Sequence, residues 1–238
     1  MNIFVATKKL ILDLLFPVLC LNCQKEGEIL CEQCRNSLSW LVPTCFVCRK
    51  MALTMEKMPA GRTCAACRKK TKIFAYLSPF SYDSTVIREL IHSLKYSRIK
   101  MVSGVFADLL RQYFNYQRVF FPPNSLFIPI PLHKSRKRIR GFNQTELISC
   151  QLEKLLGIPV QAGILKKIRK TAPQTELSAT ERRQNVINSF AVFNAEAIKN
   201  KIILLVDDVK TTGATLEEAA RVLKKAGAKQ VWTITVAH

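Results

Sequence analysis

The sequence is poor in acidic residues. Asp and Glu number 17, against 37 Lys and Arg, which leaves a formal net charge of +20. An imbalance of this size favours a polyanionic partner, with nucleic acid ahead of a membrane surface, although charge that only serves solubility is the alternative. Disorder is excluded by the 48% hydrophobic content. A chain of 238 residues can form one or two domains with a full core.

The sequence also lacks an apolar run long enough to cross a bilayer. Residues 8–20 imitate a signal peptide, but Asp13 interrupts the apolar run and Leu19 is too large to neighbour a cleavage site. Cys20 moreover belongs to a pattern that repeats downstream. We therefore expect an amphipathic helix over residues 3–16 and a cytoplasmic protein without a membrane span.

Almost no cysteine stands outside that repeated pattern. Eight of the nine cysteines form four Cys-x-x-Cys pairs, which are Cys20/Cys23, Cys31/Cys34, Cys45/Cys48 and Cys64/Cys67. Two such pairs complete one tetrahedral Cys₄ site, so the eight predict two structural Zn²⁺ ions that support folding rather than catalysis. Sequential pairing is preferred because it resembles a double zinc ribbon. Cross-brace pairing stays open, and a disulfide framework is disfavoured in the cytoplasm.

The cysteines stop near residue 70, where apolar patterning resumes, which predicts a Cys-rich domain over 1–70 and a second domain over 71–238. Lys69 and Lys70 belong to a basic group around the last two cysteine pairs. Such a ribbon could contact nucleic acid or protein, and a solvated surface explains it equally well. In the second domain, periodicity predicts helices over 84–94, 102–116 and 143–156 and a strand over 126–131.

The C-terminal part has the pattern of a βαβ unit. Residues 202–206 are a continuous apolar run typical of a strand buried on both faces, and 231–236 form the next strand. Between them Thr215 and Glu218 predict a capping box at the start of a helix, and Gly227 is suited to follow its end. The fold class is therefore α/β, a parallel sheet flanked by helices.

The loop between this strand and helix carries specific chemistry. Asp207 and Asp208 end the strand, where sugar hydroxyls or a divalent cation can compensate adjacent carboxylates. A phosphate can be bound by backbone N–H groups, hydroxyls and the helix N-terminus. The residues assigned to it are Lys210, Thr211, Thr212, Gly213, Ala214 and Thr215.

Residues 206–215, Val-Asp-Asp-Val-Lys-Thr-Thr-Gly-Ala-Thr, resemble the phosphoribosyl-pyrophosphate (PRPP) motif of type I phosphoribosyltransferases. An acidic turn followed by a helix cap would explain these residues singly but not their order. The resemblance implies a type I phosphoribosyltransferase-like parallel sheet, with Asp207 and Asp208 as the catalytic acids that hold the ribose hydroxyls.

A basic segment is expected as a loop after the strand that ends near Pro131. It concentrates cationic residues that only an anionic ligand would favour, namely Lys134, Arg136, Lys137, Arg138 and Arg140. Together with Lys69 and Lys70, the last four are our candidates for contacts with nucleic acid. Phe142 beside them is expected to pack rather than to stack a base.

The pattern Pro-Leu-His-x-x-Arg-x-x-x-Arg-Gly-Phe-Asn-Gln over residues 131–144, combined with the Cys-rich head, resembles the ComF/ComFC family of competence proteins. The resemblance covers almost the whole chain. It implies that the loop at Pro131 to Lys134, including His133, binds pyrophosphate together with Arg140.

The polar stretch 169–185 has little periodicity and is similar to the flexible loop that closes over the diphosphate in phosphoribosyltransferases. Its residues that match this pattern are Arg169, Thr171, Gln174, Arg182 and Asn185. Arg169 is assigned to phosphate binding. A surface loop that never touches ligand is the alternative.

The resemblance implies PRPP binding with Mg²⁺, single-stranded DNA as a partner during DNA uptake or processing, and other competence or recombination proteins as further partners. Two other functions stay open. One is an active phosphoribosyltransferase with an unidentified acceptor, for which positioning and charge neutralisation would suffice. The other is a regulator that senses PRPP without turnover. Whether the chain is an enzyme is left undecided by the sequence.

Overall fold

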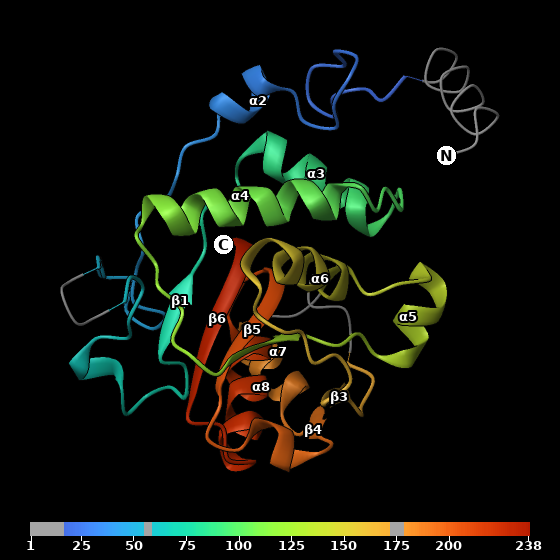
Figure 1. The fold of residues 1–238 in the computed structure, drawn as a ribbon. Coiled ribbons are helices and arrows are strands. Elements are labelled where there is room, and N and C mark those ends of the chain that lie inside the picture. Colours follow the sequence, from blue (N-terminus) through green and yellow to red (C-terminus); the bar gives the residue numbers. More distant parts are fainter. Residues whose placement is uncertain (1–16, 55–58, 172–178) are drawn as a thin grey trace.

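The structure, a computed structural model, describes residues 17–54, 59–171 and 179–238, with the side chains of 179, 180, 182 and 183 excepted. The helix expected over 3–16 lies outside this part. The fold is built on a four-stranded parallel sheet with the strand order β1-β6-β5-β2 (Figure 1). Its strands are β1 (Ala75–Leu77), β2 (Ser125–Pro129), β5 (Ile202–Val209) and β6 (Gln230–Ala237).

Strand β5 lies in the middle of this sheet and explains why the predicted parallel arrangement forms. Its first five residues are all buried, as expected for a strand that is covered on both faces. Because side chains alternate, Leu204 belongs to the core on one face and Leu205 to the core on the other. Leu204 pairs in register with Phe127 of β2 and Trp232 of β6, so two large buried aromatic residues flank it at the centre of the sheet.

Three helices cover the Leu204 face of the sheet (Figure 1). They are α3 (Thr85–Lys95), α4 (Val102–Tyr116) and α6 (Gln144–Leu156), close to the three predicted ranges. Ser84 caps α3, since its hydroxyl accepts a hydrogen bond from the Ile87 N–H at 3.5 Å. These helices form because their apolar residues recur with helical period and pack onto the sheet.

The opposite face is covered by α8 (Ala214–Lys225) and by a two-stranded antiparallel sheet. The smaller elements on this side are β3 (Leu165–Lys167), α7 (Ala179–Val186), β4 (Phe190–Val192) and the 3₁₀ helix η3 (Ala195–Ile198). The capping-box prediction is wrong, because α8 begins at Ala214 with Gly213 as its N-cap residue. Glu218 instead pairs with Arg221 at 2.7 Å. The expected glycine after the helix is confirmed by the positive φ of Gly227, +100°.

The Cys-rich head extends over two parts of the molecule. Its helical elements are α2 (Glu32–Asn36) and η1 (Ala65–Cys67). The first part lies over α3 and α4 (Figure 1) and is joined to α4 by the ion pair of Arg35 with Asp108, at 2.7 Å. The second part is hydrogen-bonded to β1, where the Tyr76 N–H donates to the Gly61 carbonyl at 2.9 Å. The division of the chain into 1–70 and 71–238 stays a prediction.

Among the described residues, the structure has no helix that is both long and apolar enough to cross a membrane.

Candidate functional site

The two adjacent carboxylates lie at the carboxyl end of β5, where open α/β sheets bind ligands. Because successive side chains of a strand point to opposite faces, Asp207 and Asp208 face different sides of the sheet. Asp208 is buried and forms an ion pair with Lys95 Nζ at 2.9 Å. Asp207 is partly exposed, and its Oδ1 accepts a hydrogen bond from the Asp208 N–H at 2.9 Å.

A hydrogen-bonded bridge joins Asp208 to the basic segment. Gln144 is buried at the first position of α6, and its Nε2 donates to Asp208 Oδ2 at 2.7 Å. The Gln144 Oε1 accepts from Arg140 Nη1, also at 2.7 Å. Lys95, at the end of α3, completes the surroundings of Asp208. Burial alone would lower the pKa of Lys95, but the Asp208 carboxylate raises it above its ordinary value. The sequence analysis did not assign either residue to the site, because Lys95 belongs to a basic turn of a kind that is more often solvated and Gln144 entered only as the last residue of the 131–144 pattern.

The electrostatics on the Asp207 side are different. Burial raises the pKa of Asp207 from its ordinary value of 3.8 to about 7, and the neighbouring charge of Asp208 acts in the same direction. Lys167 of β3 is close enough to oppose this effect. Burial, together with the charge of Arg136, lowers the pKa of Lys167 to about 8. Asp207 and Lys167, an acid and a base whose pKa values are both shifted toward neutrality, therefore lie near the carboxyl end of β5.

The predicted phosphate loop occupies residues 210–215, directly after β5. Gly213 adopts the left-handed conformation with φ +80°, and α8, a helix of 12 residues, begins at the next position. Thr212 accepts a hydrogen bond from the Ala214 N–H at 3.4 Å. The Lys210 side chain is buried and lies over the rings of Phe46 and Tyr76. The loop thus presents the start of a helix dipole immediately beyond the two acids.

The basic segment corrects a prediction, because it is a helix rather than a loop. Helix α5 (Lys134–Arg140) is capped by His133, whose Nδ1 accepts from the Ser135 N–H at 3.3 Å, and it ends at Gly141 with φ +84°. Lys and Arg are good helix formers, and the cap residues at both ends terminate the helix cleanly. The pattern of charge alone had concealed the helix. None of its residues is buried.

The basic side chains of α5 therefore stand on an exposed helix. The exposed members are Lys134, Arg136, Lys137 and Arg138, while Arg140 is half-buried. The turn between α3 and α4 lies against this helix, since Arg98 Nη2 donates to the Ile139 carbonyl at 2.8 Å. Tyr96 from the same turn is 65% exposed, with the Arg140 guanidinium 5.6 Å from its ring centroid. We define α5, Tyr96, Arg98 and Lys100 as the basic face.

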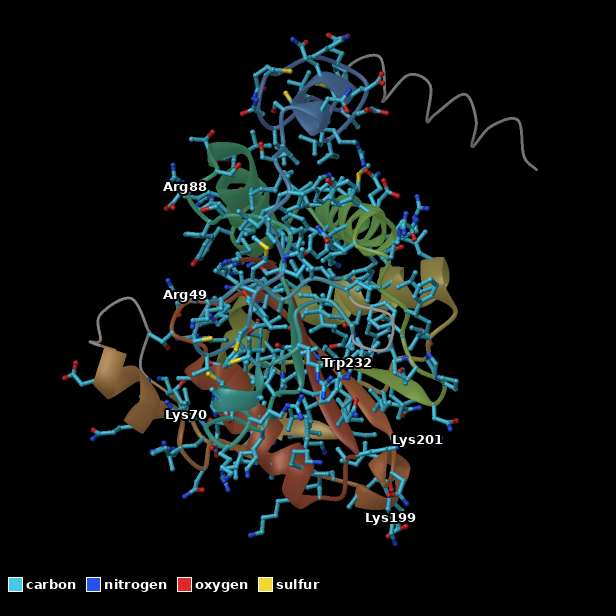
Figure 2. All side chains as sticks on the ribbon, turned by 90° about the vertical axis from the view of Figure 1, so that its left-hand side faces the viewer. Arg49, Lys70, Arg88, Lys199, Lys201 and Trp232 are labelled. Carbon is cyan, nitrogen blue, oxygen red and sulfur yellow. The ribbon has the colours of Figure 1, made fainter. Side chains whose placement is uncertain are left out.

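Tyr96 is a third residue that the sequence analysis did not assign, because a single aromatic in a basic turn gives no local signal of exposure. Phe142 is buried, 7% exposed, and has the packing position that we expected. Lys69 and Lys70 are exposed beside the second group of cysteines. Lys70 lies on the same side of the molecule as Arg49, whereas Trp232 lies in the interior (Figure 2).

The stretch predicted to close over the diphosphate, residues 169–185, connects β3 to β4, which pair with each other. Arg169 Nη2 donates to the carbonyls of Asn185 and Ile187 at 2.9 and 2.7 Å, and Thr171 is buried. Gln174 and the side chain of Arg182 lie outside the part of the chain that the structure describes. The assignment of Arg169 to phosphate binding stays a prediction.

The cysteines form the two groups that sequential pairing predicted, Cys20/Cys23/Cys31/Cys34 and Cys45/Cys48/Cys64/Cys67. Within each group the four sulfurs lie within 4.8 Å of one another, which suits a tetrahedral ion with metal–sulfur distances of about 2.3 Å. All nine cysteines are free thiols, so no disulfide competes.

The two groups repeat one local geometry. The Cys31 N–H donates to Cys20 Sγ and the Cys64 N–H to Cys45 Sγ, each at 3.5 Å. Burial alone would raise the pKa of the Cys20 and Cys45 thiols, but hydrogen bonds from backbone N–H groups lower it below the ordinary thiol value. Each group can therefore hold one structural metal ion.

Comparison with known proteins gives consistent matches. The family model "Phosphoribosyl transferase domain" matches residues 148–238. Competence protein F of Haemophilus influenzae is 32% identical over 223 residues, covering 90% of this chain and 88% of the relative. DNA utilization protein YhgH of Salmonella typhi is 29% identical, covering 92% and 96%. Competence protein ComFC of Bacillus subtilis is 26% identical, covering 85% and 81%.

Proposed function

The chain belongs to the ComF family of competence and DNA utilization proteins and has a phosphoribosyltransferase-like domain. From this premise we propose that the protein has two ligands. One is PRPP, bound together with Mg²⁺, and the other is single-stranded DNA. PRPP would bind at the carboxyl end of β5 and DNA on the basic face. One observation carries the proposal: Asp207 and Asp208 lie at the end of β5, and only a short loop separates them from the start of α8 at Ala214, which Gly213 caps.

The two halves of this site suit the two halves of a sugar phosphate. The acids can accept hydrogen bonds from ribose hydroxyls, whereas the N–H groups of residues 211–215 and the N-terminus of α8 can bind the 5′-phosphate. The pyrophosphate would then lie toward cationic side chains. Lys167 and Arg136 are close enough to Asp207 or to each other to affect the pKa values on that side.

The donor set also fits Mg²⁺, which takes oxygen ligands from one or two carboxylates and from substrate phosphates. Asp207 would be the residue to face the ion, because Asp208 is already engaged by Lys95 and Gln144. When bound, Mg²⁺ would neutralise negative charge on the diphosphate. The protein side chains would position the sugar, and no nucleophile of the chain is required.

The basic face supports the DNA half of the proposal. Exposed cations on a helix bind a phosphate backbone regardless of sequence, and an exposed aromatic ring beside them can stack a base. Tyr96 has this position, since its ring is exposed and next to the Arg140 guanidinium. Arg140 also contacts Gln144, so the basic face and the acid pair share a hydrogen-bonded connection.

Calorimetric titration of the metal-loaded protein with PRPP, with and without Mg²⁺, tests the first half. We expect saturable binding that requires Mg²⁺ and is lost in Asp207→Asn. No binding by a folded wild-type sample would refute the PRPP proposal. Release of pyrophosphate on addition of nucleobases would show that the site also catalyses transfer.

Fluorescence anisotropy with a labelled single-stranded oligonucleotide tests the second half. We expect affinity to fall steeply with salt, and the double variant Arg136→Ala, Lys137→Ala to reduce the salt slope by roughly 1–2. The matched control is the double variant Lys225→Ala, Lys229→Ala, which removes two exposed cations beside the amino end of β6 and should leave the affinity nearly unchanged. Binding that is independent of both salt and the two cations of α5 would exclude the basic face.

A further inference from the structure

The second group of cysteines contacts the phosphate loop through the residue that it encloses. Phe46 lies between Cys45 and Cys48, and a β-carbon built on Gly213 would lie 2.7 Å from Phe46 Cζ. The ring therefore lies directly on the loop glycine, at a distance that leaves no space for a side chain. Phe46 is 9% exposed and packs edge-to-face on Tyr76, with 5.5 Å between the ring centroids.

The same ring also contacts the loop lysine. Lys210 Nζ lies 4.9 Å from the centroid of Phe46 and 5.0 Å from that of Tyr76, which is within the range of cation–π attraction. Lys210 is only 7% exposed, so its position depends on these two rings. Phe46 thus fixes both the first residue of the loop and the glycine that precedes α8.

A second contact joins the residues directly after the Cys-rich head to the first turn of α8. Glu217 accepts hydrogen bonds from the Thr71 hydroxyl and from the Lys72 N–H, the latter at 2.8 Å. Thr71 follows Cys67, the last ligand of the second group, by only a few residues. The head consequently contacts the phosphate loop through Phe46, and the residues that directly follow the head contact the next helix through Glu217.

From these contacts we propose that the second Cys₄ group is a metal-dependent support of the phosphate loop, with Phe46 as the positioning residue. A metal ion on the four thiols fixes the short turn that carries Phe46, and the ring holds residues 210–213 in the conformation that receives a phosphate. This inference rests on the proposed function for its ligand, but the contact itself does not. The first group is attached elsewhere, since the ion pair of Arg35 with Asp108 joins it to α4, and it therefore serves as the comparison.

The coupling must be reciprocal. If metal at the second group improves phosphate binding, a bound phosphate must tighten metal binding there by the same factor. In equilibrium competition with a chelator, PRPP should therefore raise the affinity of the protein for one of the two metal ions and leave its affinity for the other unchanged.

Two cysteine variants form a matched pair for the test. Cys23 and Cys48 are the second cysteines of their pairs and both are exposed, so Cys23→Ser and Cys48→Ser each remove one ligand from one group. Hydrogen exchange of residues 210–217 is measured without ligand, and the metal content of each variant is determined. We expect Cys48→Ser to speed loop exchange by about ten-fold or more and Cys23→Ser to leave it unchanged.

Phe46 variants separate the ring from the metal. Phe46→Ala, with both metal ions retained, should speed exchange of the loop amides and weaken PRPP binding by about ten-fold. Phe46→Leu should restore much of both, since it keeps apolar volume over Gly213. Equal loop exchange in Cys23→Ser, Cys48→Ser and wild type would overturn the inference. If wild type fails to bind PRPP, the proposed ligand is wrong, and the exchange contrast still decides the coupling.

Discussion

Neutralising the first acid of the pair should stabilise the fold while removing ligand binding. In the native state, burial and the neighbouring Asp208 raise the pKa of Asp207 from 3.8 to about 7. The native protein therefore retains a proton between about pH 4 and pH 7 that the unfolded chain releases. Stability falls as pH rises through this range, and the full cost of the charge is present above about pH 7.

The magnitude follows from the difference between the two pKa values. About three pH units correspond to about 4 kcal/mol at most, and the partial exposure of Asp207 reduces the expected value to roughly 1–3 kcal/mol. Asp207→Asn removes the charge and retains the acceptor for the Asp208 N–H. Its gain in unfolding free energy should be near zero at pH 4, should increase up to about pH 7, and should then level off.

The neighbouring substitution should act in the opposite direction. Asp208→Asn removes the negative partner of Lys95, whose side chain is only 20% exposed, and leaves a mostly buried ammonium unpaired. We expect a loss of about 2 kcal/mol at pH 8, below the range for a fully buried pair because Lys95 is partly hydrated.

Urea unfolding followed by circular dichroism, at several pH values between 4 and 8, measures both differences from wild type. Comparison with wild type at each pH cancels the contributions of all other titrating groups. A gain for Asp207→Asn that is the same at pH 4 and pH 8, or a loss at pH 8, would refute the raised pKa of this partly buried carboxyl. Equal effects of the two substitutions would refute the claim that the acids face different surroundings.

Three further results are expected. Gln144→Ala removes the bridge between Arg140 and Asp208 and should weaken PRPP binding by about ten-fold in calorimetry, so unchanged affinity would show that the bridge is not needed. Tyr96→Ala should weaken binding of single-stranded DNA by roughly 5–100-fold in anisotropy, whereas Tyr116→Ala, at the far end of α4, should not; equal effects would argue against stacking on the basic face. Leu204→Ala at the fully buried centre of β5 should lower the urea-unfolding free energy by about 2–5 kcal/mol, and a loss under about 1 kcal/mol would contradict the packing described.

Several parts of the protein followed from the sequence alone because their signals are local. Helix α4 and strand β5 have apolar residues at helical or continuous spacing, and burial of those residues on a sheet leaves few other arrangements. The spacing of the cysteines likewise predicted two Cys₄ sites, but it left sequential and cross-brace pairing open, and the structure shows the preferred sequential grouping. The order of acids, hydroxyls and glycine over residues 207–215 likewise predicts a phosphate-binding loop from the sequence alone.

Two predictions from local sequence patterns were wrong, one about the basic segment after Pro131 and one about the start of α8. The density of Lys and Arg after Pro131 suggested a loop, but those residues favour a helix and Gly141 supplies its end. At α8 the hydroxyl of Thr215 suggested a cap, whereas the turn at Gly213, with its positive φ, places the helix start two residues earlier.

Only the tertiary structure decided which distant residues meet. Lys95 and Gln144 approach Asp208 because α3 and α6 pack on the same face of the sheet. Phe46 reaches Gly213 because the second group of cysteines lies against β1 and the loop that follows β5. Contacts between residues far apart in the chain leave no periodic trace in the sequence, since they depend on how whole elements pack. Short stretches of sequence therefore identified the candidate ligand-binding residues, whereas the packing of whole elements determined which of them contact one another.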